Sequence, residues 1–189
     1  MSTKRFTPEK IESLKEREIF VFGSNIQGEH VGGAAYIAWK QFGADYGKGF
    51  GLEENSYAIP TCIRLYENGK RFTKPFASVE QIKPFVEVFI NDAKRCDHLT
   101  FYVTKIGCGI AGFKVSEIAE LFRPCLELDN VILPEEFVKW LLYPVVIANV
   151  SERRWVSGKH YDDDTLMNFV MENIERKSVD DILDEFEKL

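Results

Sequence analysis

The chain has 189 residues, of which 45% are hydrophobic and 29% are charged, so it is long and apolar enough for one folded domain with a sizeable core. Its net charge is −6, but residues 161–189 hold ten Asp or Glu against three Lys or Arg, which leaves residues 1–160 at +1 and argues against general binding of duplex nucleic acid. The four cysteines are widely spaced and form no C-x-x-C pair, which excludes the usual metal and disulfide frameworks and fits a reducing compartment.

The beginning of the chain is polar and charged and predicts no signal peptide. Thr7 followed by Pro8 is typical of a helix N-cap with proline at the first helical position, and predicts a helix over 7–17. The longest apolar run, residues 140–150, is too short to span a bilayer and contains Pro144. We therefore expect a cytoplasmic protein with no membrane partner.

A buried strand and a helix that begins with small residues come next. Residues 19–22 are a continuous β-branched and aromatic run, which is typical of a strand buried on both faces. After a loop over 24–31, Gly-Gly-Ala-Ala at 32–35 opens a helix that ends near 42–43. This order of elements aims backbone N–H groups at an anion. Alternatively, the small residues only let the helix pack closely on the sheet.

The middle of the chain alternates between glycine-rich, extended and helical patterns. Residues 43–55 are expected to form a glycine-rich loop, and the sequence leaves open whether this loop closes over a ligand as a lid. A short strand is predicted over 57–60, ending at its proline, and residues 63–77 are expected to be irregular. A Ser-x-x-Gln capping box predicts a helix over 78–96, in which an internal proline allows a kink or a later start.

A third strand over 99–103 runs into a second glycine-rich turn at 107–112. The elements predicted after this turn are a helix over 116–122, a strand over 130–133, and capped helices over 164–174 and 178–189. The sequence thus divides into an α/β domain over 1–145 and an acidic helical extension over 146–189. The charge of the extension would suit a protein partner.

Strands that alternate with helices predict right-handed crossovers and a mixed central sheet, and hence a three-layer α/β/α fold. Ligands of such sheets bind beyond the carboxyl ends of the strands. Both glycine-rich segments follow strands directly, so they are expected to meet at one edge and form a pocket for a phosphate-bearing nucleotide or phosphosugar. The residues predicted to line this pocket are Gly23, Ser24, Asn25, Gly32, Gly33, Ala34, Gly107, Cys108, Gly109, Ile110, Ala111, Gly112 and Phe113.

Three polar residues of the first loop are candidates for chemistry. The amide of Asn25 could both donate to and accept from ribose hydroxyls, or it could stabilise its own turn. His30 could act as a general base, assisted or replaced by Glu29, or it could be an exposed loop histidine. We therefore name Asn25 and His30 as the candidate catalytic residues.

Two residues of the second turn have competing interpretations. Cys108 could be a nucleophile if a basic partner lowered its pKa, or a small side chain packed beneath the turn. Phe113 could stack on a base or sugar, or belong to the core. No P-loop spacing and no G-x-S-x-G elbow occurs, which disfavours ATP hydrolysis and α/β-hydrolase chemistry. No cofactor is expected.

Several blocks of the sequence resemble the macro domain superfamily, which binds ADP-ribose and related metabolites. Residues 22–25 and 32–35 resemble its asparagine-containing loop and glycine-run helix start, and residues 57–61 resemble its middle strand. Residues 107–113 resemble its second phosphate loop, S-T-G-I-Y-G-Y/F. The order and spacing agree over about 19–123, most closely with a macro-like branch found in bacteria and their phages.

This resemblance implies a macro-like fold in which Asn25 contacts the distal ribose, Gly32 and Gly33 lie against the ribose or diphosphate, and residues 109–113 wrap the diphosphate. The sequence departs from the family in three ways. It has no clear counterpart of the early G-D-I-T-like segment whose aspartate reads adenine, it has one asparagine where the family often has two, and alanine replaces part of the glycine run.

Three functions follow from these observations. The first is hydrolysis of an ADP-ribosyl linkage or a related ester. The second is a module that binds the same ligand without turnover. The third is an interaction protein that engages a partner through its acidic tail.

Overall fold

The computed structural model describes residues 6–141, and its helices and strands up to residue 132 lie in a compact unit that ends at Phe137. With η for a 3₁₀ helix, these elements are β1 (Glu18–Asn25), α1 (Gly33–Gln41), β2 (Gly51–Glu53), β3 (Ser56–Glu67), β4 (Lys70–Pro75), η1 (Val79–Gln81), α2 (Lys83–Arg95), β5 (Thr100–Val103), α3 (Val115–Ala119), η2 (Glu120–Glu127) and β6 (Val131–Ile132). The predicted boundary after residue 145 and the predicted extension over 146–189 lie outside the described residues. None of the described helices has the length and apolar character needed to cross a membrane.

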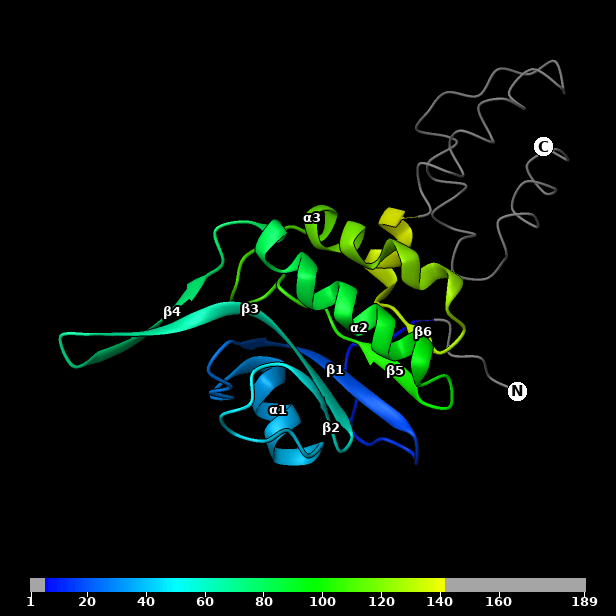
Figure 1. Ribbon diagram of the computed structural model, residues 1–189, viewed down its shortest axis with the longest axis horizontal. Coiled ribbons are helices and arrows are strands. Elements are labelled where there is room, and N and C mark those ends of the chain that lie inside the picture. Colours follow the sequence, from blue (N-terminus) through cyan, green and yellow to red (C-terminus); the bar gives the residue numbers. More distant parts are fainter. Residues whose placement is uncertain (1–5, 142–189) are drawn as a thin grey trace, which may run out of the picture. The chain divides into compact units, whose positions relative to one another are not determined.

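The strands form one mixed sheet, as predicted (Figure 1). Their order is β2-β3-β1-β5-β6, with β4 also paired to β3. The central strand β1 runs parallel to β3 and β5, and β6 runs parallel to β5, whereas β2 and β4 are antiparallel to β3. Because β1 and β5 are parallel neighbours, the loops that follow them leave the sheet at the same edge.

Helices cover both faces of this sheet (Figure 1). Phe20 of β1 packs with Ala38 of α1 in one buried cluster. Val21 points the other way, because side chains alternate along a strand, and its neighbour on β3 is Tyr57. The ring of Tyr57 contacts that of Phe89 of α2, with 5.0 Å between centroids. The fold is therefore α/β, with α1 on one face of the sheet and α2 on the other.

The helix predicted over 7–17 is wrong: this segment forms no helix, and Arg17 has a φ of 70°. The Thr7 backbone N–H instead donates to the Leu133 carbonyl at 2.9 Å, and its hydroxyl donates to the Ile132 carbonyl at 2.7 Å. The backbone and hydroxyl groups of Thr7 are thus satisfied by a segment more than a hundred residues away. No local sequence pattern can reveal such a pairing.

The strand predicted to stop at Pro60 continues to Glu67, and the region expected to be irregular forms a hairpin of β3 with β4. The register explains how the strand tolerates a proline. β2 pairs with β3 only up to Ala58, and β4 begins its pairing at Cys62. Pro60 lies in the gap between these two partners, where its missing N–H leaves no ladder hydrogen bond unmade.

The later start allowed for the helix over 78–96 is the one observed: α2 begins at Lys83 after the turn η1. Pro84 thus occupies the first turn of α2, where a proline needs no hydrogen bond. The helix predicted over 116–122 forms as α3 and continues as the 3₁₀ helix η2.

Candidate functional site

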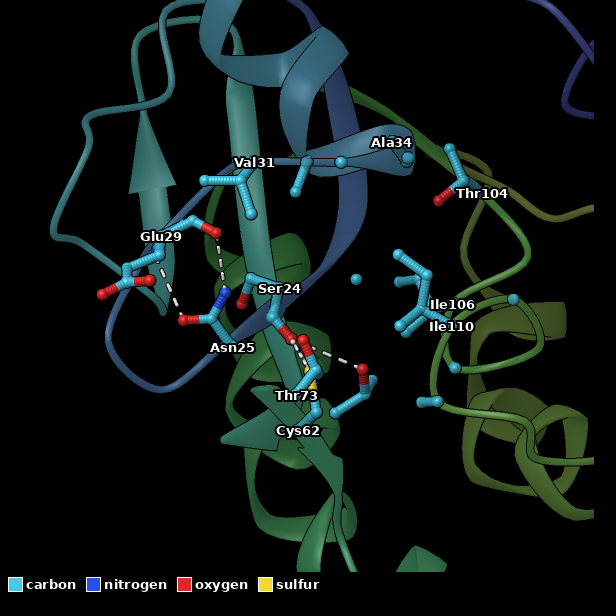
Figure 2. A pocket seen from close by; sticks show the side chains of 18 of the residues that line it. Ser24, Asn25, Glu29, Val31, Ala34, Cys62, Thr73, Thr104, Ile106 and Ile110 are labelled. Atoms are coloured by element: carbon cyan, nitrogen blue, oxygen red, sulfur yellow. Dashed lines mark hydrogen bonds between the residues drawn. The ribbon is translucent and has the colours of Figure 1, made fainter. Parts of the chain in front are cut away.

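A cavity of about 380 Å³ lies at the edge of the sheet where β1 and β5 end. It is bounded by the segment after β1, which we call the first loop (residues 26–32), and by the segment after β5, the second loop (residues 104–114). Figure 2 shows Ser24 on one side of this space and Ile106 and Ile110 on the other. The two glycine-rich segments therefore meet, as their positions after parallel strands predicted.

Ten of the thirteen residues predicted to bind a ligand line the cavity. They are Gly23, Ser24, Asn25, Gly32, Gly33, Ala34, Gly107, Gly109, Ile110 and Ala111. Cys108, Gly112 and Phe113 are not among the lining residues. Burial raises the pKa of the Cys108 thiol to about 11, so this cysteine is protonated at neutral pH.

The N-terminus of α1 opens onto the cavity without a cap. The N-cap is Gly32, which offers no side-chain hydrogen bond, and the first turn holds no acidic residue. Within the described residues, the N–H groups of Gly33, Ala34 and Ala35 donate to no protein acceptor. These three residues line the cavity, so the positive end of the helix is available to an anion there.

The second loop is closed by its own hydrogen bonds. The Phe113 N–H donates to the Gly107 carbonyl at 3.0 Å, and the Gly112 N–H donates to the Gly109 carbonyl at 2.9 Å. Gly107 has a φ of 74°, and a Cβ there would lie 3.0 Å from the side chain of Ile118. Within the described residues, the N–H groups of Gly107, Gly109, Ile110 and Ala111 donate no hydrogen bond, and all four residues line the cavity.

The side chain of Asn25 holds the backbone of the first loop. Its amide nitrogen donates to the Glu29 carbonyl at 2.9 Å, and its amide oxygen accepts from the Glu29 N–H at 3.1 Å (Figure 2). This geometry matches the turn-stabilising alternative for Asn25. The residue also lines the cavity, and its amide nitrogen carries a second hydrogen beyond the one given to Glu29.

His30 is fully buried and is not among the lining residues, so the expected alternative of an exposed loop histidine is wrong. Its Nε2 lies 3.1 Å from the Lys48 carbonyl, and its ring meets the edge of Phe22 at 5.3 Å between centroids. Burial lowers the pKa of His30, which favours the neutral imidazole.

The glycine-rich segment 43–55 packs against the first loop and contributes no lining residue to the cavity. Gly47 donates its N–H to the Gly28 carbonyl at 2.9 Å, and the Ser24 hydroxyl donates to the Gly49 carbonyl. A Cβ on Gly28 would lie 2.2 Å from the Lys48 nitrogen, so the two backbones touch at this point. The first loop is thereby clamped from outside the cavity.

Sequence reasoning missed the side of the cavity that β3 and β4 provide. Arg64 and Thr73, which are paired across the hairpin, both line the cavity, and the Arg64 guanidinium donates to the Thr73 hydroxyl. A signal for this hairpin was present: Asn68 and Gly69, with φ of 51° and 73°, form the two-residue turn that joins antiparallel strands. This dipeptide could have placed Arg64 near the site.

The charged side chains of the cavity are two cations and one carboxylate. Arg64 and Glu29 lie beside each other, with 3.7 Å between the Arg64 Nε and the Glu29 Oε2. Lys105 also lines the cavity and donates to Glu136 at 2.8 Å, a hydrogen bond that raises the pKa of Lys105. Together with the N–H groups of both loops, these charges make the site suited to an anion.

Comparisons of the chain with protein-family models, with curated proteins and with solved structures found no match.

Proposed function

We propose that this protein binds ADP-ribose or a related phosphate-bearing nucleotide derivative in a macro-type pocket. The observation that supports the proposal best is that seven backbone N–H groups, without a protein acceptor among the described residues, belong to residues lining one cavity. They are those of Gly33, Ala34, Ala35, Gly107, Gly109, Ile110 and Ala111. Backbone donors in two facing loops are well suited to the several oxygens of a diphosphate.

The size and charge of the cavity agree with this ligand class. Its volume of about 380 Å³ is within the range of small-molecule sites, roughly 300–1,000 Å³. Lys105 and Arg64 add positive charge that suits a phosphate. The exposed side chains of Val31 and Ile110 give the cavity apolar surface that a sugar or base could cover.

The chemistry of the lining residues favours binding over hydrolysis. Among the residues that line the cavity, the one carboxylate is Glu29, and it already accepts a hydrogen bond from Tyr66 and lies beside two arginines. His30 is buried away from the lining, and the Cys62 thiol, which lines the cavity, has its pKa raised by burial. We therefore propose a ligand-binding module rather than a hydrolase.

The proposal is tested by measuring the binding of ADP-ribose, ADP, ribose 5-phosphate and adenosine to the full chain. Binding is measured by thermal shift and by calorimetry. We expect ADP-ribose and ADP to raise the melting temperature and adenosine to leave it unchanged, because ligand binding to the folded state stabilises it. Absence of any shift at millimolar concentration across the panel would contradict the proposal. Release of ADP-ribose from an ADP-ribosylated substrate would show turnover instead.

A matched pair of variants locates the site. Gly32 has extended backbone, and a Cβ there would lie 3.8 Å from the Ile110 side chain, between the two loops. Gly32→Val should fill this space and weaken ADP-ribose binding by about tenfold or more without strain in the backbone. Gln41→Val, at the other end of α1, is the control and should bind like the unmodified chain.

A further inference from the structure

Three side chains from the β3–β4 hairpin surround the carboxylate of Glu29. The Tyr66 hydroxyl donates to Oε1, while Arg64 Nε and Arg71 Nη1 lie 3.7 Å and 3.5 Å from Oε2. The two arginines differ in their surroundings. The Arg64 side chain is 14% exposed and lines the cavity, whereas that of Arg71 is 46% exposed and does not line it.

The pairing between Glu29 and Arg64 is incomplete. Both side chains are largely removed from water, with 13% and 14% exposed, so each charge needs close hydrogen-bonded partners. The separation of 3.7 Å is too long for a hydrogen bond, and both the Arg64 Nε and the Glu29 Oε2 are buried atoms without a hydrogen-bond partner in the described residues. One edge of the Arg64 guanidinium therefore has unused donor capacity beside the cavity.

The rest of Arg64 is held firmly. Its backbone N–H donates to the Gln27 side chain at 2.8 Å, and its Nη1 donates to the Thr73 hydroxyl. The first loop thus holds the backbone of Arg64, and the hairpin holds its guanidinium, before any ligand arrives. Fixed planar donors are what bidentate recognition of a phosphate or carboxylate requires.

We infer that Arg64 is the side chain that binds an anionic group of the ligand, and that Glu29 is its exchangeable counter-ion in the free protein. This inference rests on the proposed function for the identity of the whole ligand. On binding, a phosphate oxygen takes the Nε edge of Arg64 that Glu29 now faces at a distance. Glu29 keeps the Tyr66 hydroxyl and Arg71, so neither carboxylate nor guanidinium is left without a partner.

If the ligand replaces Glu29 as the partner of Arg64, substitutions of these two residues should change ligand binding in opposite directions. Arg64→Gln should weaken binding by about ten- to a hundredfold, because a charge-assisted hydrogen bond is lost. Glu29→Gln should tighten binding by about three- to tenfold, because the competing charge is removed while an acceptor for Tyr66 remains. A purely structural clamp between hairpin and loop would predict weaker binding for both variants.

The experiment measures binding of ADP-ribose, and separately of inorganic pyrophosphate, by calorimetry on the full chain and on these variants. Arg71→Gln is the matched comparison, since it also removes a cation beside Glu29 but one outside the cavity. It should weaken binding by about threefold or less, because Glu29 loses only one of the two partners that it keeps when the ligand is bound. Arg64→Lys keeps the charge but loses the planar fork, and should be intermediate. Melting temperatures of all variants show whether each remains folded.

The outcomes separate the two proposals. If the chain binds pyrophosphate but not ADP-ribose, the proposed function is contradicted. The role of Arg64 in anion binding is then tested with pyrophosphate as the ligand. Equal losses for Arg64→Gln and Arg71→Gln, unchanged binding by Arg64→Gln, or weaker binding by Glu29→Gln would overturn the exchange. Failure of the unmodified chain to bind either anion would overturn both.

Discussion

Gly49, which lies against the first loop, and Gly109, in the second loop, are both glycines outside the left-handed region of backbone conformation, yet their surroundings differ. A Cβ on Gly49 would lie 2.1 Å from the Asn25 carbonyl oxygen, whereas a Cβ on Gly109 would meet nothing within 4 Å. The glycine beside the first loop is therefore required by the packing of the protein on itself. The glycine of the second loop instead leaves open space beside the cavity. The fold does not require this space, but a bound ligand would.

The largest expected effect is a loss of stability when a methyl group is added at the closely packed glycine, Gly49. Gly49→Ala should lower the free energy of unfolding by about 3 kcal/mol or more, because the methyl group collides with backbone rather than with a movable side chain. Gly109→Ala should change it by about 0.5 kcal/mol or less. Urea unfolding of the two variants measures both values, and equal losses would show that the loops do not differ in this way.

A smaller effect is expected from the side chain that holds the first loop from within. Asn25→Ala removes two hydrogen bonds to the Glu29 backbone and should lower the free energy of unfolding by about 2 kcal/mol. Asn25→Asp keeps the acceptor but not the donor and should lose about half as much. If Asn25→Ala unfolds like the unmodified chain while its ligand binding is abolished, the side chain serves the ligand and not the loop.

The smallest effect is a dependence of stability on pH. Burial depresses the pKa of His30 in the folded state below its ordinary 6.5, so the unfolded chain takes up the proton first as the pH falls. The contribution of His30 to stability is therefore fully present well above pH 6.5 and is lost as the pH falls below 6.5.

Unfolding at pH 7.5 and 5.5 measures this loss, and His30→Gln should reduce it. A pH dependence that survives His30→Gln unchanged would assign the titration to another group.

The parts of the fold that could be predicted are those whose signal is local. The run at 19–22 is buried throughout, and the Gly-Gly-Ala-Ala sequence at 32–35 opens α1, so the strand, the helix and the edge where they meet followed from pattern alone. The second loop could be placed beside the first because both follow parallel strands.

The rest depended on contacts between distant segments. The prediction for 7–17 failed because Thr7 pairs with a segment near residue 133. The prediction that the strand over 57–60 ends at its proline failed because Pro60 lies in a gap between two partner strands. Whether the Asn25 side chain turns to its own loop or to a ligand is decided by the position of Glu29, which the sequence does not fix. The hairpin that carries Arg64, by contrast, had a local signal in the turn at Asn68 and Gly69, which the prediction for 63–77 overlooked.

The two-residue turn at Asn68 and Gly69 has a consequence for how the cavity can change during evolution. Its length sets the pairing of Arg64 with Thr73, and one inserted residue would shift the register, turning every side chain of β4 to the opposite face. The polarity of one cavity wall is thus encoded in a loop length as well as in residue identities. Relatives with a longer tip could present a different wall to a ligand while keeping the same core.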